Sequence, residues 1–229
     1  MKRQESLTLV ELLAVIATIT LLMAILLPTL SRTRQQAQAT ICKSNLSQIG
    51  LAAYLYTDSW NYYLPRGTGS ADKTWFELLL PYLSHKPTDN DYRNVRIYHC
   101  PAYPDKEQTV CFVNNTWEFN SPDDSTGHFI DEPTRILDLR RLDGTIYLAD
   151  NEDGPGRDII KRKGDPGWHT CDVWSTDHLP KESNLQRRVA RTRHNKGSAQ
   201  QGCNALYLDW HSDWVGADDM TPDMWKFRK

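Results

Sequence analysis

Glu11 is the residue of this chain whose chemistry most needs an explanation. It lies at the start of an apolar run, Leu12 to Leu27, and follows a short leader that carries Lys2 and Arg3. A carboxylate in such a run is costly to place in hydrocarbon, so an acid within a membrane-spanning segment is a candidate functional group. We therefore treat Glu11 as a candidate site residue.

A second group of candidate residues lies near the C-terminus. His194, Asp209, His211 and Asp213 carry the side chains that bind zinc and other divalent ions. A turn falls between Asp209 and His211, however, and Asp and His beside a tight turn more often hydrogen-bond to the backbone. We therefore assign no role to the hairpin motif formed by His194, Asp209 and His211.

Acidic loops raise the question of calcium. Asp150, Glu152 and Asp153 lie close together, and Asp123 is followed by Asp124. Calcium prefers such hard oxygen ligands, but the spacing is not that of an EF-hand loop, and solvated acidic loops are common without an ion. Asp150, Glu152 and Asp153 are the first residues to test for calcium, and we expect no other cofactor.

The five cysteines give no clear framework. In an oxidising compartment one or two disulfides can form, for example between Cys100 and Cys111, and Cys42 lies on a helix that can bring it to the rest of the chain. No Cys-x2-Cys pair occurs, and we therefore expect no zinc site. Connectivity among Cys42, Cys100, Cys111, Cys171 and Cys203 stays open.

Catalytic and nucleic-acid-binding signals are missing from the sequence. There is no Gly-x-Ser-x-Gly, no His-Glu-x-x-His and no glycine-rich phosphate loop. A net charge of −2 and a pI near 6.4 show no basic surplus. We expect a protein that is not an enzyme and has no nucleic-acid partner.

One long helix must position Glu11. Residues 7–58 read as helical, and 7–30 are apolar enough to span a membrane. From Arg32 to Tyr56 there is no proline, and Pro28 should loosen the helix where it leaves the membrane. Apolar residues recur there at three- and four-residue steps, which predicts an amphipathic stripe. The stripe consists of Ala39, Cys42, Leu46, Ile49, Ala53 and Tyr56.

Residues 59–229 predict an α+β head with a small antiparallel sheet against the long helix. Residues 75–83 read as a short helix, and Thr221 and Pro222 open a last one. Strands are predicted from β-branched and aromatic runs between turn signals, at 96–100, 109–113, 145–149, 205–209 and 213–215.

The leader sets the expected orientation. Lys2 and Arg3 favour a cytoplasmic N-terminus, which places the head outside. We expect a single-pass inner-membrane protein with a periplasmic or extracellular head. A cleaved secretory signal peptide fits less well, because no Ala-x-Ala site precedes Arg32.

The stretch from Ser6 to Glu11 resembles the prepilin cleavage and methylation motif of type IV pilins and type II secretion pseudopilins. The resemblance implies that a prepilin peptidase removes residues 1–6 and methylates the amine of Leu7. Glu11 is then the fifth mature residue and Pro28 the twenty-second, as in that family. Ser6 stands where the family almost always has Gly. The implied partners are the peptidase and identical or related subunits, and the implied product is a filament.

A second resemblance covers Cys42 to Leu51, which is similar to the Cys-x-x-Asn-Leu-x-Gln-Ile-Gly signature of planctomycete-type pilin-like proteins. Many members of that group end in a hairpin with His, nine residues, Asp-Gly and His. Here fourteen residues separate His194 from Asp209, and Trp210 replaces the Gly. Because Trp resists positive φ, we expect the hairpin to be kept with an altered turn geometry.

Three functions follow from the sequence. The first is a pilin-like structural subunit of a type II secretion- or type IV pilus-like system. The second is a membrane-tethered module whose aromatic head binds polysaccharide, since eight Trp are many for such a head. Core and half-buried packing is nevertheless the more common role of such residues. The third is an anchored hydrolase with a metal in the head.

Overall fold

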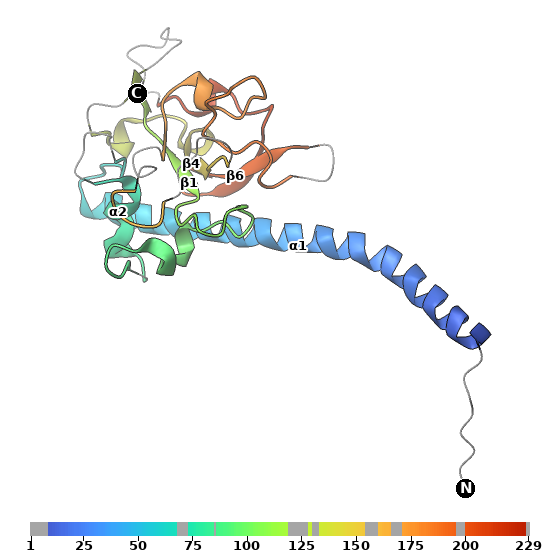
Figure 1. Cartoon of the computed structure of the whole chain (residues 1–229). Coiled ribbons are helices and arrows are strands. Elements are labelled where there is room, and N and C mark those ends of the chain that lie inside the picture. The colour runs from blue at the N-terminus through green and yellow to red at the C-terminus, as the bar shows by residue number, and fades with distance from the viewer. Residues whose placement is uncertain are drawn as a thin grey trace. The chain divides into compact units, whose positions relative to one another are not determined.

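The computed structural model describes residues 9–67, 73–84, 86–118, 128–129, 133–153, 160–165, 171–195 and 200–227 (Figure 1). The expected leader, with Ser6 and Leu7, lies outside these residues. The chain divides into two compact units, Met1–Ala37 and Gln38–Lys229. Helix α1 (Leu9–Ser59) contributes to both units, and each is described by itself below.

The first unit is the apolar part of α1. All described residues from Leu9 to Ala37 are exposed, with Leu9 81% and Leu30 67% accessible. This part contains Glu11 in the first turn and Pro28 inside the helix. It is long and apolar enough to cross a membrane, judged by length and composition.

Four threonines of this unit form hydrogen bonds from their hydroxyl groups to the backbone of their own helix. The hydroxyls of Thr18, Thr20, Thr29 and Thr33 donate to backbone carbonyls three or four residues earlier. A hydroxyl bonded in this way is cheaper to place in hydrocarbon than a free one. The threonines are therefore compatible with the apolar character of the segment.

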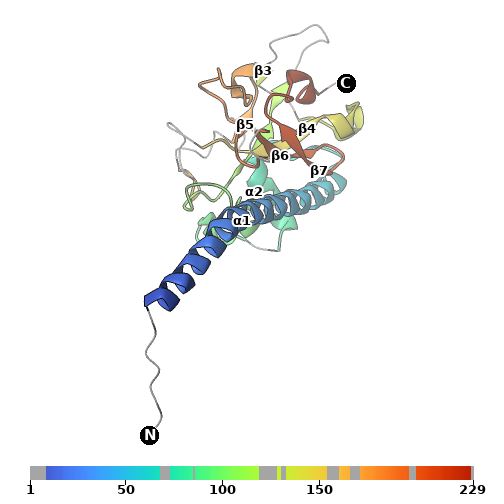
Figure 2. The ribbon, with the colours of Figure 1, turned by 90° about the vertical axis from the view of Figure 1, so that its right-hand side faces the viewer.

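In the second unit, residues 38–59 of α1 pack on the head through one face, as predicted. Cys42, Leu46, Ile49 and Ala53 are fully buried, whereas Ser44 on the opposite side is exposed. Lys43 forms an ion pair of 2.9 Å with Asp213. The predicted amphipathic stripe is confirmed, and it anchors the helix to the sheet (Figure 2).

The head contains a five-stranded sheet in the order β5-β1-β4-β6-β7. Its strands are β1 (Phe112–Asn115), β4 (Ile146–Asp150), β5 (Asp172–Val173), β6 (Gly202–Tyr207) and β7 (Ser212–Gly216). All neighbouring pairs are antiparallel except β1 with β5, which is parallel. A separate ribbon pairs β2 (Trp117–Glu118) with β3 (His128–Phe129). The predicted α+β class is confirmed, and the sheet is mixed.

Two apolar clusters cover the two faces of the sheet. Leu206 and Leu208 belong to the cluster on the α1 side, whereas Ala205 and Tyr207 belong to the other. This alternation along β6 is the period of two expected for a strand. In β4 the register shifts between Ile146 and Leu148, so that two consecutive side chains reach the same cluster.

Of two further elements, the predicted short helix at 75–83 is nearly correct and the predicted strand at 96–100 is not. Residues 75–82 form helix α2 (Trp75–Leu79) and a 3-10 turn (Leu80–Tyr82), close to the predicted short helix. The strand predicted at 96–100 is wrong, because Arg96–Tyr98 is a 3-10 turn. Its two anchors, Val95 and Tyr98, are both fully buried, and a spacing of three suits a turn rather than a strand.

Trp210 occupies the turn of the β6–β7 hairpin with a φ of 71°. The expectation that Trp would resist a positive φ here is therefore wrong. The ring of Trp210 packs edge-on against Tyr147 at 5.7 Å, and its backbone N–H donates to the Tyr207 carbonyl at 3.0 Å. These contacts offset a left-handed conformation that costs roughly 1–2 kcal/mol for a residue other than Gly.

Candidate functional site

Four buried side chains meet where α1 crosses the sheet. Cys42, Cys100, Asp150 and His194 each place one potential ligand atom within 4.8 Å of the other three. Their exposed fractions are 0%, 3%, 0% and 5%. Among the described residues this is the group of Cys, His and acidic side chains that could hold a metal ion. We refer to these four residues as the buried thiol cluster.

The members of the cluster contact one another directly. The Cys42 thiol donates to Asp150 Oδ1 at 3.0 Å, and Cys100 Sγ lies 3.3 Å from His194 Nε2. His194 Nε2 also lies 3.6 Å from Asp150 Oδ2. The backbone N–H of Asn204 donates to that same oxygen at 2.7 Å and fixes the carboxylate.

Each residue is positioned by a different element. Cys42 projects from the buried stripe of α1, and Asp150 is the last residue of β4. Cys100 is held against α1 because the Asn45 amide donates to the His99 carbonyl at 2.8 Å. His194 is held beside β6, since its backbone N–H donates to the Gly202 carbonyl at 2.9 Å.

The thiols of the cluster differ in acidity. Burial, together with Cys100 and Asp150, raises the pKa of Cys42 well above its usual value. The neighbouring Cys42 thiol lowers the pKa of Cys100 to about 6, and His194 acts in the same direction. Burial opposes charge on His194, but the hydrogen bond to Cys100 and the charge of Asp150 raise its pKa. Cys100 is therefore the thiol that most readily becomes a thiolate.

Arg193 places a fixed positive charge beside the cluster. Its side chain is almost fully buried, pairs with Asp153 at 2.7 Å and donates to the Asn151 carbonyl at 2.6 Å. The guanidinium also lies 4.2 Å from the ring centre of Tyr103. Burial works against the charge, yet Asp153 and Asp150 raise the pKa of Arg193. The arginine thus balances part of the negative charge that the cluster can carry.

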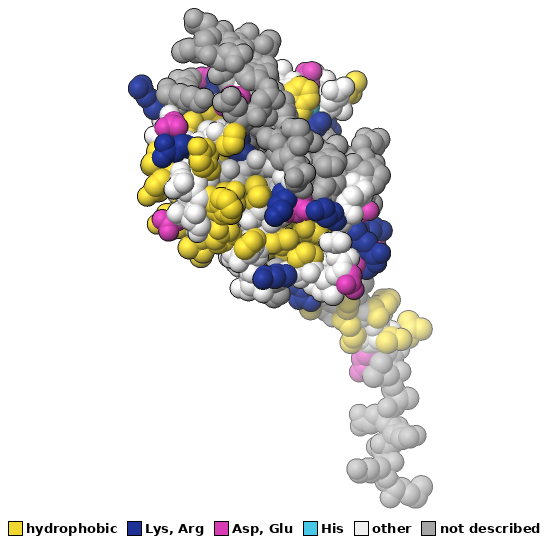
Figure 3. Space-filling view, turned by 90° about the vertical axis from the view of Figure 1, so that its left-hand side faces the viewer, with side chains coloured by type: hydrophobic (Ala, Val, Ile, Leu, Met, Phe, Trp, Pro, Cys, Tyr) yellow, Lys and Arg dark blue, Asp and Glu magenta, His cyan; other side chains and the backbone are white. Residues whose placement is uncertain are grey.

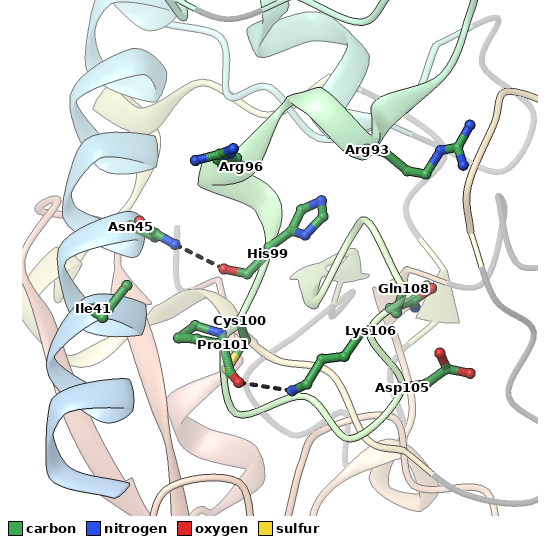
Figure 4. Close-up of a pocket in the computed structure, with 10 residues that line it drawn as sticks. All are labelled: Ile41, Asn45, Arg93, Arg96, His99, Cys100, Pro101, Asp105, Lys106 and Gln108. Carbon is green, nitrogen blue, oxygen red and sulfur yellow. Dashed lines mark hydrogen bonds between the residues drawn. The ribbon is translucent and has the colours of Figure 1, made fainter. Parts of the chain in front are cut away.

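A cavity of about 300 Å³ opens on the Cys100 side of the cluster (Figure 4). Its wall includes Ile41 and Asn45 of α1 and three basic side chains, Arg93, Arg96 and Lys106. Lys106 is tied to the Pro101 carbonyl at 2.9 Å, as Figure 4 shows. The cavity therefore gives small solutes a route to the Cys100 wall.

The residues of the hairpin motif are not brought together. His194 is buried in the thiol cluster, whereas Asp209 and His211 are exposed and form a pair with each other. The His211 ring stacks on Tyr207 at 4.3 Å. Asp213 pairs instead with Lys43. Only His194 of this set therefore lies where a metal could be enclosed.

The residues predicted for calcium have three separate sets of partners. Asp150 belongs to the thiol cluster, Glu152 accepts from Arg187 at 2.6 Å, and Asp153 pairs with Arg193. Glu152 is 7% exposed, so its carboxylate is a buried structural partner of Arg187. Asp123 and Asp124 lie outside the described residues. The calcium site stays a prediction.

The buried thiol cluster was not predicted from the sequence. All five cysteines are buried free thiols, and the Cys111 thiol points to the Gln108 carbonyl at 3.8 Å rather than to Cys100. We expected no zinc site because the sequence has no Cys-x2-Cys pair. The residues of the cluster are far apart in the chain, however, and Cys42 and Asp150 are separated by 108 positions. The usable signal was the position of Cys42 in the apolar stripe, which required it to face the head.

The tryptophans are divided between core and surface. Trp75, Trp117 and Trp225 are almost fully buried, Trp60 is 57% exposed, and Trp168 lies outside the described residues. Trp60 stacks on Tyr56 at 5.7 Å and donates its ring N–H to the Tyr82 hydroxyl at 3.1 Å. Hydrophobic side chains also reach the surface on the face drawn in Figure 3, with Lys and Arg among them.

Comparison with known proteins gives one family. No curated protein and no solved structure matches the chain. A family model described as "Protein of unknown function (DUF1559)" matches residues 31–138, a little under half of the chain. The match includes Cys42 to Leu51, the stretch that resembles planctomycete-type pilin-like proteins. Together, the DUF1559 match and the apolar helix that begins at Leu9 suggest a membrane-anchored, pilin-like protein.

Proposed function

We propose that this chain is a subunit of a pilin-like filament, held in the inner membrane by α1 until it assembles. It would serve a type II secretion- or type IV pilus-like system as a structural protein rather than as an enzyme. Its partners would be a prepilin peptidase and identical or related subunits, and its head would be periplasmic or extracellular.

One observation carries this proposal, namely the exposure of α1 on all sides before Gln38. Leu12, Leu21 and Leu22 are 53%, 65% and 60% exposed, and they point in different directions around the helix. A helix that is apolar all round needs an apolar environment, which lipid or neighbouring helices can supply. Both environments are available to a subunit that leaves the membrane for a filament core.

Glu11 supplies the negative charge for the proposed contact between subunits. Removal of residues 1–6 would create an amine at Leu7 in an apolar environment, and a charge there needs a partner. The Glu11 carboxylate of a neighbouring subunit has the right sign and lies one helical turn further along the chain. Pairing the two groups would set the axial step between subunits.

Crosslinking in membranes tests this contact. We expect Glu11→Leu to insert normally but to lose the ladder of crosslinked subunits that the unchanged chain gives. Thr20→Ala is the matched control, because this hydroxyl bonds only within its own helix at 2.9 Å. An unchanged ladder for Glu11→Leu would sink the proposed pairing.

The mature N-terminus tests the processing step. Mass spectrometry should find a chain that begins with methylated Leu7. Ser6→Gly should keep or speed cleavage, whereas Ser6→Leu should block it. An intact Met1 on the native protein, or equal processing of both variants, would rule out the peptidase as a partner.

A tethered binding module is the second candidate function. The observation that favours it is the exposed Trp60, which forms an aromatic group with Tyr56 and Tyr82. Flat aromatic rings at a surface suit the apolar face of a sugar. The full chain in detergent should then bind extracellular polysaccharides on a glycan array, and Trp60→Ala should abolish binding while Leu185→Ala, another exposed residue, should not.

A further inference from the structure

We propose that Cys42, Cys100, Asp150 and His194 bind one structural zinc ion within the head. This inference is independent of filament assembly, since all four residues belong to the unit Gln38–Lys229.

The donor set suits zinc. Two sulfurs, one imidazole nitrogen and one carboxylate oxygen are all common zinc ligands, and four of them complete a tetrahedron. Hard cations such as calcium and magnesium prefer sites made only of oxygen ligands. The two thiols therefore make these ions poor candidates for this site. Zinc is the common divalent ion that combines sulfur, nitrogen and oxygen ligands at a closed site.

The distances fit a tetrahedron after a small contraction. With zinc–sulfur bonds of about 2.3 Å and zinc–nitrogen or zinc–oxygen bonds of about 2.0 Å, neighbouring ligand atoms lie roughly 3.3–3.8 Å apart. The Cys100–His194 distance is 3.3 Å and the His194–Asp150 distance is 3.6 Å. Across the whole cluster no pair exceeds 4.8 Å. Rotation of the Cys42 side chain would complete the geometry.

A zinc ion would give each of the four buried side chains a bonding partner, whereas a disulfide would do so only for the two cysteines. A bond between Cys42 and Cys100 would remove the thiol that donates to Asp150 and the one that contacts His194. A fully buried carboxylate and an imidazole would then lose partners, which is costly. Coordination gives each of them a strong partner at once.

The surroundings balance the charge of the filled site. Two thiolates, one carboxylate and a zinc ion leave about one negative charge, and the thiol protons are released to solvent. Arg193 supplies a buried positive charge next to the cluster. The Asn204 backbone N–H donates to the Asp150 carboxylate and fixes its orientation, as hydrogen-bond donors to metal-bound carboxylates do.

The closed geometry indicates a structural role. Four protein ligands leave no position for a substrate, in contrast to catalytic zinc sites with three ligands and a water. The ion would join α1, the segment after Tyr98, strand β4 and the segment before β6. The cavity beside Cys100 offers the path by which the ion enters (Figure 4).

Metal analysis of the full chain, purified in detergent without chelators, is the direct test. We expect one zinc per chain, and replacement of zinc by cobalt(II) should give the visible absorption of a tetrahedral centre with thiolate ligands. Removal of the metal should lower the unfolding midpoint by roughly 10 °C. A chain that holds no zinc and takes up neither ion when reduced would overturn the proposal.

Matched variants separate binding from general damage to the fold. Cys100→Ser and His194→Ala should lose the metal, whereas Cys171→Ser and His211→Ala should keep it, because those residues lie outside the cluster. Asp150→Asn keeps the shape of the side chain and should reduce zinc affinity while near-ultraviolet circular dichroism stays native. Full zinc content in Asp150→Asn and His194→Ala would also overturn the proposal.

Thiol counting distinguishes zinc from a disulfide. After denaturation with a chelator and without reductant, all five cysteines should react with a thiol reagent if zinc occupied the cluster. If Cys42 and Cys100 are joined instead, two cysteines will stay unreactive and the chain will contain no zinc. That second result would replace the proposed site by a disulfide.

Discussion

Gly50 of α1 lies directly against Trp210, so that a Cβ at position 50 would be 3.2 Å from the Trp210 carbonyl oxygen. The same Cβ would be 3.0 Å from Cδ1 of the buried Leu206. Both distances are shorter than ordinary contacts, and a backbone carbonyl cannot move as a flexible side chain does. Gly50 is therefore a point at which the helix and the hairpin approach closely.

We predict that Gly50→Leu destabilises the head by about 3 kcal/mol, because the added side chain must push the hairpin away from α1. Ser44→Leu, on the exposed side of the same helix, is the matched control and should change stability by about 0.5 kcal/mol or less. Denaturant unfolding followed by Trp fluorescence measures both. Equal stability of the two variants would show that the contact is loose.

The positive φ of Trp210 predicts an unusual order of stability between two variants. Trp210→Ala and Trp210→Gly both lose the contact with Tyr147, but only Gly relieves the left-handed conformation at 71°. The Gly variant should therefore be more stable than the Ala variant by about 1 kcal/mol.

The same pair of substitutions at Leu185 provides the control. Leu185 is 97% exposed and is not among the residues with positive φ. There, Ala should be at least as stable as Gly. If Ala also proved the more stable residue at position 210, the turn would have a different backbone conformation in solution.

Glu77 predicts a loss of stability in acid. Burial alone would raise its pKa, but the ion pair with Lys163 at 2.7 Å and the hydrogen bonds from Thr74 hold it below its usual 4.5. The folded chain thus binds the proton less tightly than the unfolded chain. The contribution of Glu77 is complete above about pH 4.5 and is lost as the pH falls through the lower, folded value.

Comparison of the chain with Glu77→Gln across pH tests this sign. At pH 7 the unchanged chain should be the more stable, by about 1 kcal/mol. At pH 3 the difference should shrink, because Glu77 is already mostly protonated in the unfolded chain at that pH and gains less on folding. A difference in stability that grows in acid would mean that folding raises the pKa of Glu77 and would contradict this prediction.

Arg66 shows why a similar charge is insufficient at a buried site. Its Nε donates to the Asn115 carbonyl at 2.8 Å, its Nη1 donates to Thr134 at 2.6 Å, and its guanidinium lies 4.0 Å from the centre of the Phe227 ring. Lys cannot reproduce this planar fork. We predict that Arg66→Lys costs about 2 kcal/mol, whereas Arg140→Lys at an exposed position costs less than about 0.5 kcal/mol.

Local patterns predicted the parts of this fold that depend on local periodicity. The three- and four-residue steps of Leu46, Ile49 and Ala53 identified the buried face of α1, and the β-branched and aromatic run at 145–149 identified β4 to within one residue. The segment 96–100 failed because its composition suits a strand while the spacing of Val95 and Tyr98 suits a turn.

The buried thiol cluster could not be predicted because it depends on tertiary packing. Its four residues come from a helix, a loop, a strand end and a segment before another strand, and no local spacing relates them. The hairpin motif led to His194 but paired it with Asp209 and His211, which lie on the exposed turn. Only the packing of α1 on the sheet brings Cys42 to Asp150.

The strand order β5-β1-β4-β6-β7 makes the sheet depend on a strand that lies far downstream of β4 in the chain. β4 is an interior strand only because β6, which begins at Gly202, lies beside it. A chain that ends before Gly202 would present β4 as an open edge with unpaired amides, and such edges recruit strands from other molecules. Premature termination or proteolysis in this region should therefore yield aggregation rather than a shorter soluble head.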